Sequence, residues 1–443
     1  MTSTQTEELM KYDAEHILHS LGSGGKNLGF ALESAKGIRI KDSDGKEYMD
    51  LASQLINVNF GHSRRDILEA AKAQMEKLQF TTLLRGFTNV PAIEYSQKLA
   101  QVVPDGLDHF LFTLTGADAD DCAFKIANRY YQTKGERRYK IISLFNAYHG
   151  TLRGTGGASQ VGKGIMSESP PCGTHLHTPN YNCYHCPLHL EYPSCGIECA
   201  RFLDYLIENE GANTVCCFIA EPEQGAGGFI APPPEYFPMV REICSKHGVI
   251  FIGDEVMTGF GRTGKMWALE NWGVVPDIMT MSKAIVNAYL PFGAVAISQE
   301  IFDTLRGQHL NIGSSESGNP ICCAVASKVL DIMREEHIVE HAAEMGKYAR
   351  ERFEKDFLPL PHIGSVSGLG LMLGMDIVVD KKTKAAPGPE VDNLIMHRCF
   401  EQGLYARVLQ NRFCFSPPLV ITKEEIDEAL DKVYPVLAEL KLS

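Results

Sequence analysis

The chain has 443 residues, of which 44% are apolar and 22% charged, and its formal net charge is −13. This length allows a large core and more than one lobe, and the negative charge argues against a nucleic-acid or anionic-membrane partner. No apolar run is long enough to cross a bilayer, and the first twenty residues lack a signal-peptide core. Thirteen scattered cysteines, an odd number, fit reduced thiols, so we expect a cytoplasmic protein.

The first predicted element is a β-hairpin over residues 37–51, with its turn at Asp44-Gly45. From about residue 110 to 298, short apolar strands alternate with helical segments. The expected strands are HFLFTLT, YKIISLF, VCCFIAEP, GVIFIGDE, DIMTMS and GAVAIS, and the clearest helices are AFKIANRYYQT and PEYFPMVREICSKH. This alternation predicts an α/β fold, with a mostly parallel sheet covered by helices on both faces.

The pattern changes after residue 317, where a long periodic stretch predicts connecting helices. A strand-rich piece follows, and then an amphipathic helix that Thr422 and Glu425 open as a capping box. We therefore expect a small C-terminal domain that shares its sheet with the N-terminal hairpin. The predicted parts are an N-terminal segment contributing to the small domain, a large domain and the C-terminal small domain, over residues 1–60, 61–326 and 327–443.

Two side chains that can take part in catalysis follow neighbouring strands. Asp254 ends one strand, and Lys283 stands 29 positions later, just past the next. Because the carboxyl ends of parallel strands border the same crevice, we expect the two side chains to converge. A lysine with a lowered pKa can form a Schiff base, and an aspartate can hold a protonated pyridine nitrogen. Pyridoxal phosphate (PLP) needs this pair, although either residue alone is more often a solvated lysine or a helix cap.

Three further positions suit the same cofactor. Gly116 and Ala117 lie between a strand and a helix, where backbone amides can bind a phosphate. Tyr148 follows a strand and can stack on a flat heterocycle, and Glu221, before a glycine-rich turn, can orient ring substituents or pair with an arginine. Each has an ordinary alternative: a plain strand–turn–helix, a core tyrosine or a solvated acid.

The stretch FIGDEVMTGFGRTGKMWALENWGVVPDIMTMSKAIVNAYLPFGA closely resembles the signature of the class III (omega) aminotransferases, which are fold-type I PLP-dependent enzymes. The similarity extends from the N-terminal hairpin to SPPLVITKEEIDEAL. It implies a large domain with a mostly parallel seven-stranded sheet and a smaller α+β domain. It also implies that Lys283 is the Schiff-base lysine, that Asp254 holds the pyridine nitrogen, and that the glycines of GFGRTG shape a tight loop beside the cofactor.

The same resemblance assigns the remaining cofactor contacts. Val256 would pack on one face of the ring, with Tyr148 and His149 on the other. Gly116 and Ala117 would bind the phosphate through their backbone amides.

One phosphate contact is expected to come from a neighbouring subunit. Family members use a threonine, and in GSSESGNP Ser315 takes its place and keeps a hydroxyl donor. This implies a two-fold dimer with its site at the interface, and leaves a tetramer open. Glu316 and Asn319 depart from the common tyrosine and histidine, which puts the pocket near the phosphate in doubt.

A second departure lies at the start of the helix that follows the phosphate-binding turn. Asp118 and Asp120 replace the usual Glu and Asn of GSEAN. Asp120 adds an acid near Asp254, which can raise the pKa of one of them.

Substrate preference is expected to depend on Arg407, which stands where amine:pyruvate-type members carry a mobile arginine for the substrate carboxylate. Without the resemblance, a surface arginine in an ion pair is as good an explanation. Cys414 replaces an arginine typical of ornithine and 4-aminobutyrate enzymes, and Met257 replaces a glutamine found in glutamate-linked ones. Leu55, Tyr148 and Arg85 are the other predicted substrate contacts, although Arg85 equally fits a salt bridge.

We therefore expect the enzyme to transfer an amino group from a primary amine or omega-amino acid, such as taurine or β-alanine, to a keto acid, with pyruvate favoured. The expected mechanism is ping-pong and proceeds through a Schiff base on Lys283. The main alternative keeps PLP but makes the enzyme an ammonia-lyase, racemase, aminomutase or decarboxylase. A requirement for a keto acid separates the two.

A cysteine cluster stands outside this scheme. Cys183 and Cys186 have C-x2-C spacing, and Cys195 and Cys199 have C-x3-C spacing. Thiolate tetrads commonly hold zinc, whereas a surface loop with unligated thiols is the more ordinary interpretation, so we assign no metal here. A zinc-stabilised scaffold without enzymatic activity is a third alternative.

Overall fold

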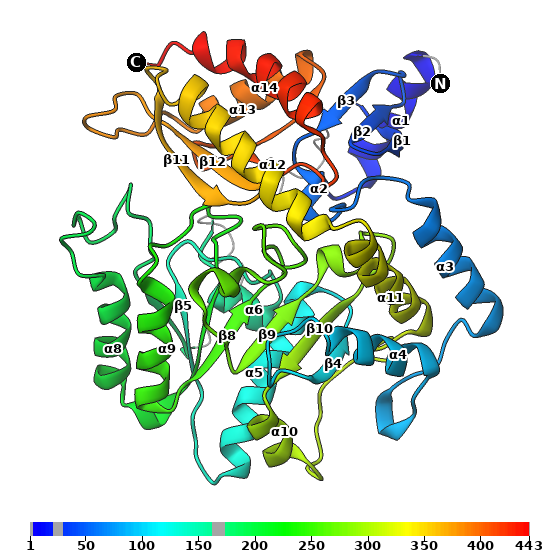
Figure 1. Ribbon diagram of the computed structural model, residues 1–443, viewed down its shortest axis with the longest axis vertical. Helices are drawn as coiled ribbons and strands as arrows, with labels where there is room; N and C mark the ends of the chain where they lie inside the picture. Colours follow the sequence, from blue (N-terminus) through cyan, green and yellow to red (C-terminus); the bar gives the residue numbers. More distant parts are fainter. Residues whose placement is uncertain (1–2, 21–29, 162–172, 443) are drawn as a thin grey trace.

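The computed structural model describes residues 3–20, 30–161 and 173–442 (Figure 1). In these parts of the chain, no helix has the length and apolar content needed to cross a membrane.

A seven-stranded sheet forms the centre of the larger lobe (Figure 1). Its order is β4-β10-β9-β8-β7-β5-β6, and only β10 runs antiparallel to its neighbours. The strands are β4 (His109–Thr113), β5 (Lys140–Leu144), β6 (His175–Thr178), β7 (Val215–Ala220), β8 (Ile250–Asp254), β9 (Ile278–Met281) and β10 (Gly293–Ile297). All six predicted strands are confirmed, whereas β6 was missed because its sequence HLHT has no apolar run.

Helices cover both faces of this sheet, as predicted. Side chains of β7 alternate between two hydrophobic clusters, Phe218 in one and Ile219 in the other. The first cluster includes side chains of α8 (Glu198–Glu210) and α9 (Tyr236–His247). The second includes those of α5 (Gly116–Thr133) and α10 (Gln299–Leu305), and α6 (Arg153–Ala158) lies beside α5.

The smaller lobe contains two sheets. The predicted hairpin is present as β2 (Arg39–Asp42) and β3 (Glu47–Asp50), next to β1 (Leu32–Lys36). From the C-terminal part, only β13 (Leu404–Tyr405) joins this sheet, in parallel with β3. The other C-terminal strands form a separate antiparallel sheet in the order β11 (Ile363–Leu369), β12 (Met372–Ile377), β15 (Arg412–Phe415) and β14 (Arg407–Leu409).

The remaining helices connect or cover the lobes. They are α1 (Ser3–His16), α2 (Ser53–Ile56), α3 (Arg65–Lys77), α4 (Val90–Leu99), α11 (Pro320–Glu335), α12 (Ile338–Arg352), α13 (Glu390–Glu401) and α14 (Lys423–Ala438), with short turns η1 (Leu84–Gly86), η2 (Ala212–Thr214), η3 (Ala268–Trp272), η4 (Lys283–Val286) and η5 (Phe353–Phe357). The predicted capping box opens α14. The boundary after residue 326 falls inside α11, which packs on α3 and α4, so the domain division stays a prediction.

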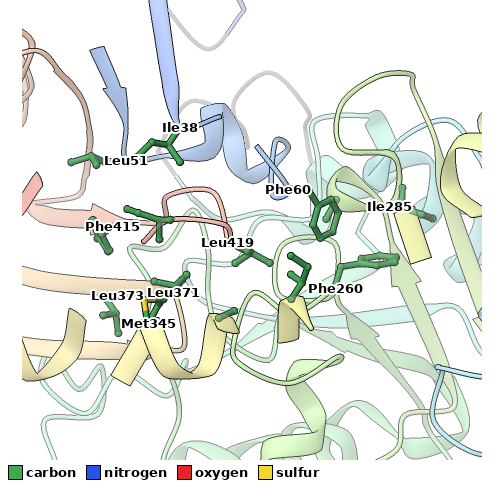
Figure 2. Packing of buried hydrophobic residues seen from close by; sticks show 14 of the residues in the cluster. Ile38, Leu51, Phe60, Phe260, Ile285, Met345, Leu371, Leu373, Phe415 and Leu419 are labelled. Carbon is green, nitrogen blue, oxygen red and sulfur yellow. The ribbon is translucent and has the colours of Figure 1, made fainter. Parts of the chain in front are cut away.

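The lobes meet across a continuous apolar core, part of which Figure 2 shows, with Phe60 and Phe260 near Leu419. A fully buried arginine, Arg262, crosses this junction. Its guanidinium donates to the carbonyls of Leu371 (3.0 Å) and Pro417 (2.7 Å).

The same guanidinium also reaches the N-terminal part of the chain. It donates to Ser53 Oγ (3.1 Å) and Asn59 Oδ1 (2.6 Å). Burial lowers the pKa of Arg262 to about 9. Gly261 and Gly264 on either side adopt positive φ angles of 89° and 80°, which few other residues tolerate. The glycines of GFGRTG therefore allow the loop after β8 to present an arginine to three distant segments.

Candidate functional site

A cavity of about 470 Å³ opens at the carboxyl ends of β8 and β9. Its walls come from strand ends, from the start of α5 and from η4. The predicted residues that line it are Gly116, Ala117, Tyr148, His149, Glu221, Asp254, Val256 and Lys283. Asp120 and Met257 line it too, together with the segment from Ala288 to Phe292.

Asp254 is the last residue of β8 and is 4% exposed. Its Oδ1 accepts the N–H of Val256 (3.0 Å), and its Oδ2 lies 2.7 Å from Nδ1 of His149. The His149 side chain has no exposed surface, and its Nε2 has no hydrogen-bond partner among the described residues. Through this contact His149 orients the carboxylate of Asp254. The sequence analysis did not anticipate the contact.

The neighbouring acid, Glu255, has a different role. Its carboxylate accepts the N–H of Leu269 (2.9 Å) and the hydroxyl of Thr258, and so fixes the loop after β8. Successive side chains of an extended chain point in opposite directions. Only Asp254 of this adjacent pair therefore reaches the cavity.

Lys283 follows β9, which pairs in parallel with β8. Its backbone has a positive φ of 49°, an unfavourable conformation for a residue with a side chain. Burial lowers the pKa of Lys283 to about 8, with a smaller contribution from the charge of Arg407, while Asp254 and Glu221 act in the opposite direction. The site thus favours a neutral, nucleophilic amine more than free lysine does.

Two further acids surround this pair. Asp120 on α5 is 1% exposed and accepts a hydrogen bond from Thr280 Oγ1 (2.6 Å). Ligand atoms of Asp120, His149 and Asp254 lie within 4.8 Å of one another. Burial, and then the charge of Asp254, raise the pKa of Asp120 well above its ordinary value. Asp120 is therefore a second acid beside Asp254, and its surroundings favour its neutral form.

Glu221 is also buried, and its burial raises its pKa to about 7. Its two carboxylate oxygens accept the N–H groups of Tyr148 (3.0 Å) and Gly225 (2.8 Å). These bonds fix its side chain at the edge of the cavity.

The start of α5 forms a part of the cavity that suits an anion. Thr115 caps the helix by accepting the N–H of Asp118, whereas the first helical N–H groups have no intrahelical partner. A Cβ on Gly116 would lie 2.7 Å from Cγ1 of Val256, so only glycine fits there. A helix start built in this way suits a phosphate group.

Four predicted residues do not line the cavity of the single chain. Leu55 is 55% exposed, and Arg85 and Ser315 are exposed as well. Arg407 begins β14 and pairs across the sheet with Cys414. No carboxylate in the described parts of the chain lies within 4 Å of the Arg407 guanidinium, although its charge influences Lys283.

The four cysteines of the predicted cluster line a separate small cavity, together with Asn180, Tyr181 and residues that follow them. A second cluster of metal-binding side chains, Asp204, Glu208 and His247, lies on the surface. Lys246 contacts both acids of this second cluster at 3.0 Å, which makes it an ion-pair network.

Comparison with known proteins identifies the class to which this fold and cavity belong. Residues 21–437 match the family model described as "Aminotransferase class-III", and the chain belongs to that family. It is a PLP-dependent enzyme of fold type I. The prediction of class is therefore confirmed, and the alternative of a scaffold without enzymatic activity is wrong.

Several named relatives illustrate the range of this family. The chain is 33% identical to a putrescine–pyruvate aminotransferase of Pseudomonas aeruginosa, over 97% of this chain and 96% of the relative. It is 34% identical to a leucine/methionine racemase of Thermococcus litoralis, over 92% and 90%. Among solved structures, an (S)-enantioselective omega-transaminase from Thermomicrobium roseum has a TM-score of 0.92, with 36% identity and 98% of each chain covered.

We predict that Asp120→Asn makes the cofactor-free protein less sensitive to rising pH. Because its pKa is raised, folded Asp120 keeps its proton to higher pH than the unfolded chain does. The stability that this gives at low pH is lost as pH rises through the folded-state pKa. The amide cannot ionise. Between the unfolded-state and the folded-state pKa of Asp120, the free energy of unfolding of the variant should therefore rise relative to that of the wild type, by up to about 1.4 kcal/mol per pH unit.

Urea denaturation between pH 5 and 9 measures this effect. Asp121→Asn is the matched control, since Asp121 lies on the same helix but forms a partly exposed ion pair with Lys125 (2.7 Å). The control should follow the wild-type curve. Parallel curves for Asp120→Asn and the wild type would contradict a protonated Asp120.

Proposed function

We propose that the protein transfers an amino group from a primary amine or an omega-amino acid, such as taurine or β-alanine, to a keto acid, with pyruvate as the favoured acceptor. The observation that carries this proposal is the convergence of Lys283 and Asp254 in one cavity, with Arg407 nearby and without a carboxylate partner among the described residues.

The residues of the cavity fit PLP. The helix start at Gly116 and Ala117 would hold its phosphate, and Asp254, oriented by His149, would hold its pyridine nitrogen. Val256 and Tyr148 would bound its ring. When bound, PLP supplies an aldehyde that reacts with amines and a ring that withdraws electrons from the carbon beside the nitrogen.

Lys283 has two functions in this proposal. Its amine, with a pKa of about 8, is the attachment point of the cofactor. When substrate displaces it, the same Nζ atom would accept a proton from the substrate carbon and donate it to the carbon that PLP contributes as its aldehyde.

Substrate preference in this proposal follows from what lies beside the cofactor pocket. Met257 and Cys414 belong to a small apolar cluster with Ile56, Phe229 and Met372. Met257 and Cys414 therefore offer no positive charge that could bind the second carboxylate of a dicarboxylate substrate. Arg407 would then bind the single carboxylate of pyruvate, or the acid group of an omega-amino acid, and the named pyruvate-linked relative agrees with this preference.

A PLP-dependent racemase, aminomutase, ammonia-lyase or decarboxylase is the second candidate. The racemase among the relatives, and the additional acid Asp120 beside Asp254, favour keeping it. Amine donors assayed with and without pyruvate separate the two: release of ammonia, of an epimer or of carbon dioxide without an acceptor would contradict transamination.

We further propose a homodimer in which Ser315 of one subunit reaches the phosphate site of the other. Ser315 is exposed in the single chain, and so are the apolar side chains of Leu55, Phe80 and Phe87. Exposed apolar groups of this size commonly mark an interface between subunits.

We predict that Lys283→Ala lowers transamination by at least about 10³-fold, because both covalent attachment and proton transfer lose their amine. The visible absorbance band of the enzyme with PLP should shift as well. Lys265→Ala is the control, since Lys265 is exposed on the loop after β8. Activity of the Lys283 variant within tenfold of the wild type would refute the proposed mechanism.

Arg407→Ala should separate acidic from uncharged substrates. The loss of one charge-assisted contact should lower kcat/KM for pyruvate or β-alanine by about 10- to 100-fold, and leave the amine half-reaction with putrescine nearly unchanged. Arg65→Ala, which alters a side chain that is 89% exposed, should change neither. Equal losses for both substrates would argue against a carboxylate-binding role.

Mixed dimers of Lys283→Ala and Ser315→Ala chains test the shared site. If Ser315 serves the partner, the Lys283-containing site of each hybrid keeps a serine and binds PLP as tightly as the wild type. If Ser315 serves its own chain, that site should bind PLP about tenfold more weakly. Absorbance titration of purified hybrids measures the difference, and sedimentation verifies the dimer.

A further inference from the structure

The four cysteines between β6 and α8 are brought together by a segment that has no regular structure. Residues 179–197 contain neither a helix nor a strand. Cys183, Cys186, Cys195 and Cys199 nevertheless line one small cavity of about 20 Å³. Ordered loops of this length are uncommon without a function or a stabilising link.

Few hydrophobic contacts stabilise the middle of this segment, because Tyr181 and Ile197 near its ends belong to the core, whereas no residue from 182 to 196 is buried. Leu190 is 40% exposed and Tyr192 is 42% exposed, although both border the same cavity. In small irregular segments of proteins, a bound metal ion often replaces the missing core.

We propose that Cys183, Cys186, Cys195 and Cys199 bind one Zn²⁺ ion tetrahedrally, as a structural site separate from the PLP cavity. No three of the four sulfurs lie within 4.8 Å of one another, whereas Zn–S bonds of about 2.3 Å require sulfur separations of roughly 3.8 Å. The proposal therefore includes a change of side-chain rotamer at these cysteines when the ion binds. Binding releases the four thiol protons to water and leaves a site with two net negative charges.

Cations close to the segment can balance that charge. Arg201 donates to the carbonyl of Gly196 (3.1 Å), and Lys384 donates to the carbonyl of Tyr184 (2.9 Å). Both contacts lie within the cysteine-rich segment, so the positive groups are already in place.

The zinc site would also support the wall of the active site. Tyr181, beside the cysteines, donates its hydroxyl to the carbonyl of Glu221 (2.7 Å), and Asn180 donates to Gln224 Oε1 (3.0 Å). Ordering of the cysteine segment therefore holds the turn that positions Glu221, although the zinc proposal itself does not rest on the proposed reaction.

Elemental analysis of the PLP-loaded enzyme tests the proposal. The protein is produced in zinc-supplemented medium, desalted and measured by mass spectrometry. We expect about one zinc per chain in the wild type and less than about 0.1 in the Cys183→Ser/Cys186→Ser double variant. Cys399→Ala, which removes a buried thiol of the other lobe, should keep the zinc.

A second measurement covers loss of metal during purification. Added zinc sulfate should protect four thiols of the folded wild type from alkylation. In the double variant it should protect neither of the two that remain, Cys195 and Cys199. Zinc-free protein without protection would overturn the proposal. Zinc retained by the double variant would overturn the assigned ligands, and stoichiometric iron would overturn the assigned metal.

Discussion

The site depends on a carboxylate that is buried before any cofactor arrives. Asp254 is nearly inaccessible to water, and its closest partners are the ring of His149 and a backbone N–H. Burying a charge costs several kcal/mol unless a positive group compensates for it. A protonated pyridine nitrogen is such a group, and burial, which raises the pKa of the adjacent Asp120, favours the neutral form of that acid and so limits its repulsion with Asp254.

This requirement orders the other parts of the cavity. Because β8 and β9 are adjacent and parallel, Asp254 and Lys283 leave the sheet at the same edge. Glu255 turns away and fixes the loop, while Lys283 enters the cavity through a left-handed backbone position. The helix start at Gly116 then supplies the third fixed point. Three separate segments thus place Asp254, Lys283 and the helix start at Gly116 around one cavity.

Much of the fold could be predicted from the sequence, since apolar strands and glycine-rich turns are local signals. The strand β6 could not, because its alternating histidines do not resemble a buried strand. The residues that line the cavity were predictable because strand ends converge in a parallel sheet. The contact between His149 and Asp254 links positions 105 residues apart, and no local pattern specifies it. Ser315 and Arg85 do not line the cavity of the single chain, so their contacts stay predictions.

The buried guanidinium of Arg262 has a consequence for how the enzyme matures. Two of its acceptors, the carbonyls of Leu371 and Pro417, belong to parts of the chain synthesised more than a hundred residues later. Until the ribosome has released those segments, Arg262 has only its acceptors in the N-terminal part of the chain, Ser53 and Asn59. The loop beside the cavity can therefore reach its final set of contacts only late in the synthesis of each new polypeptide.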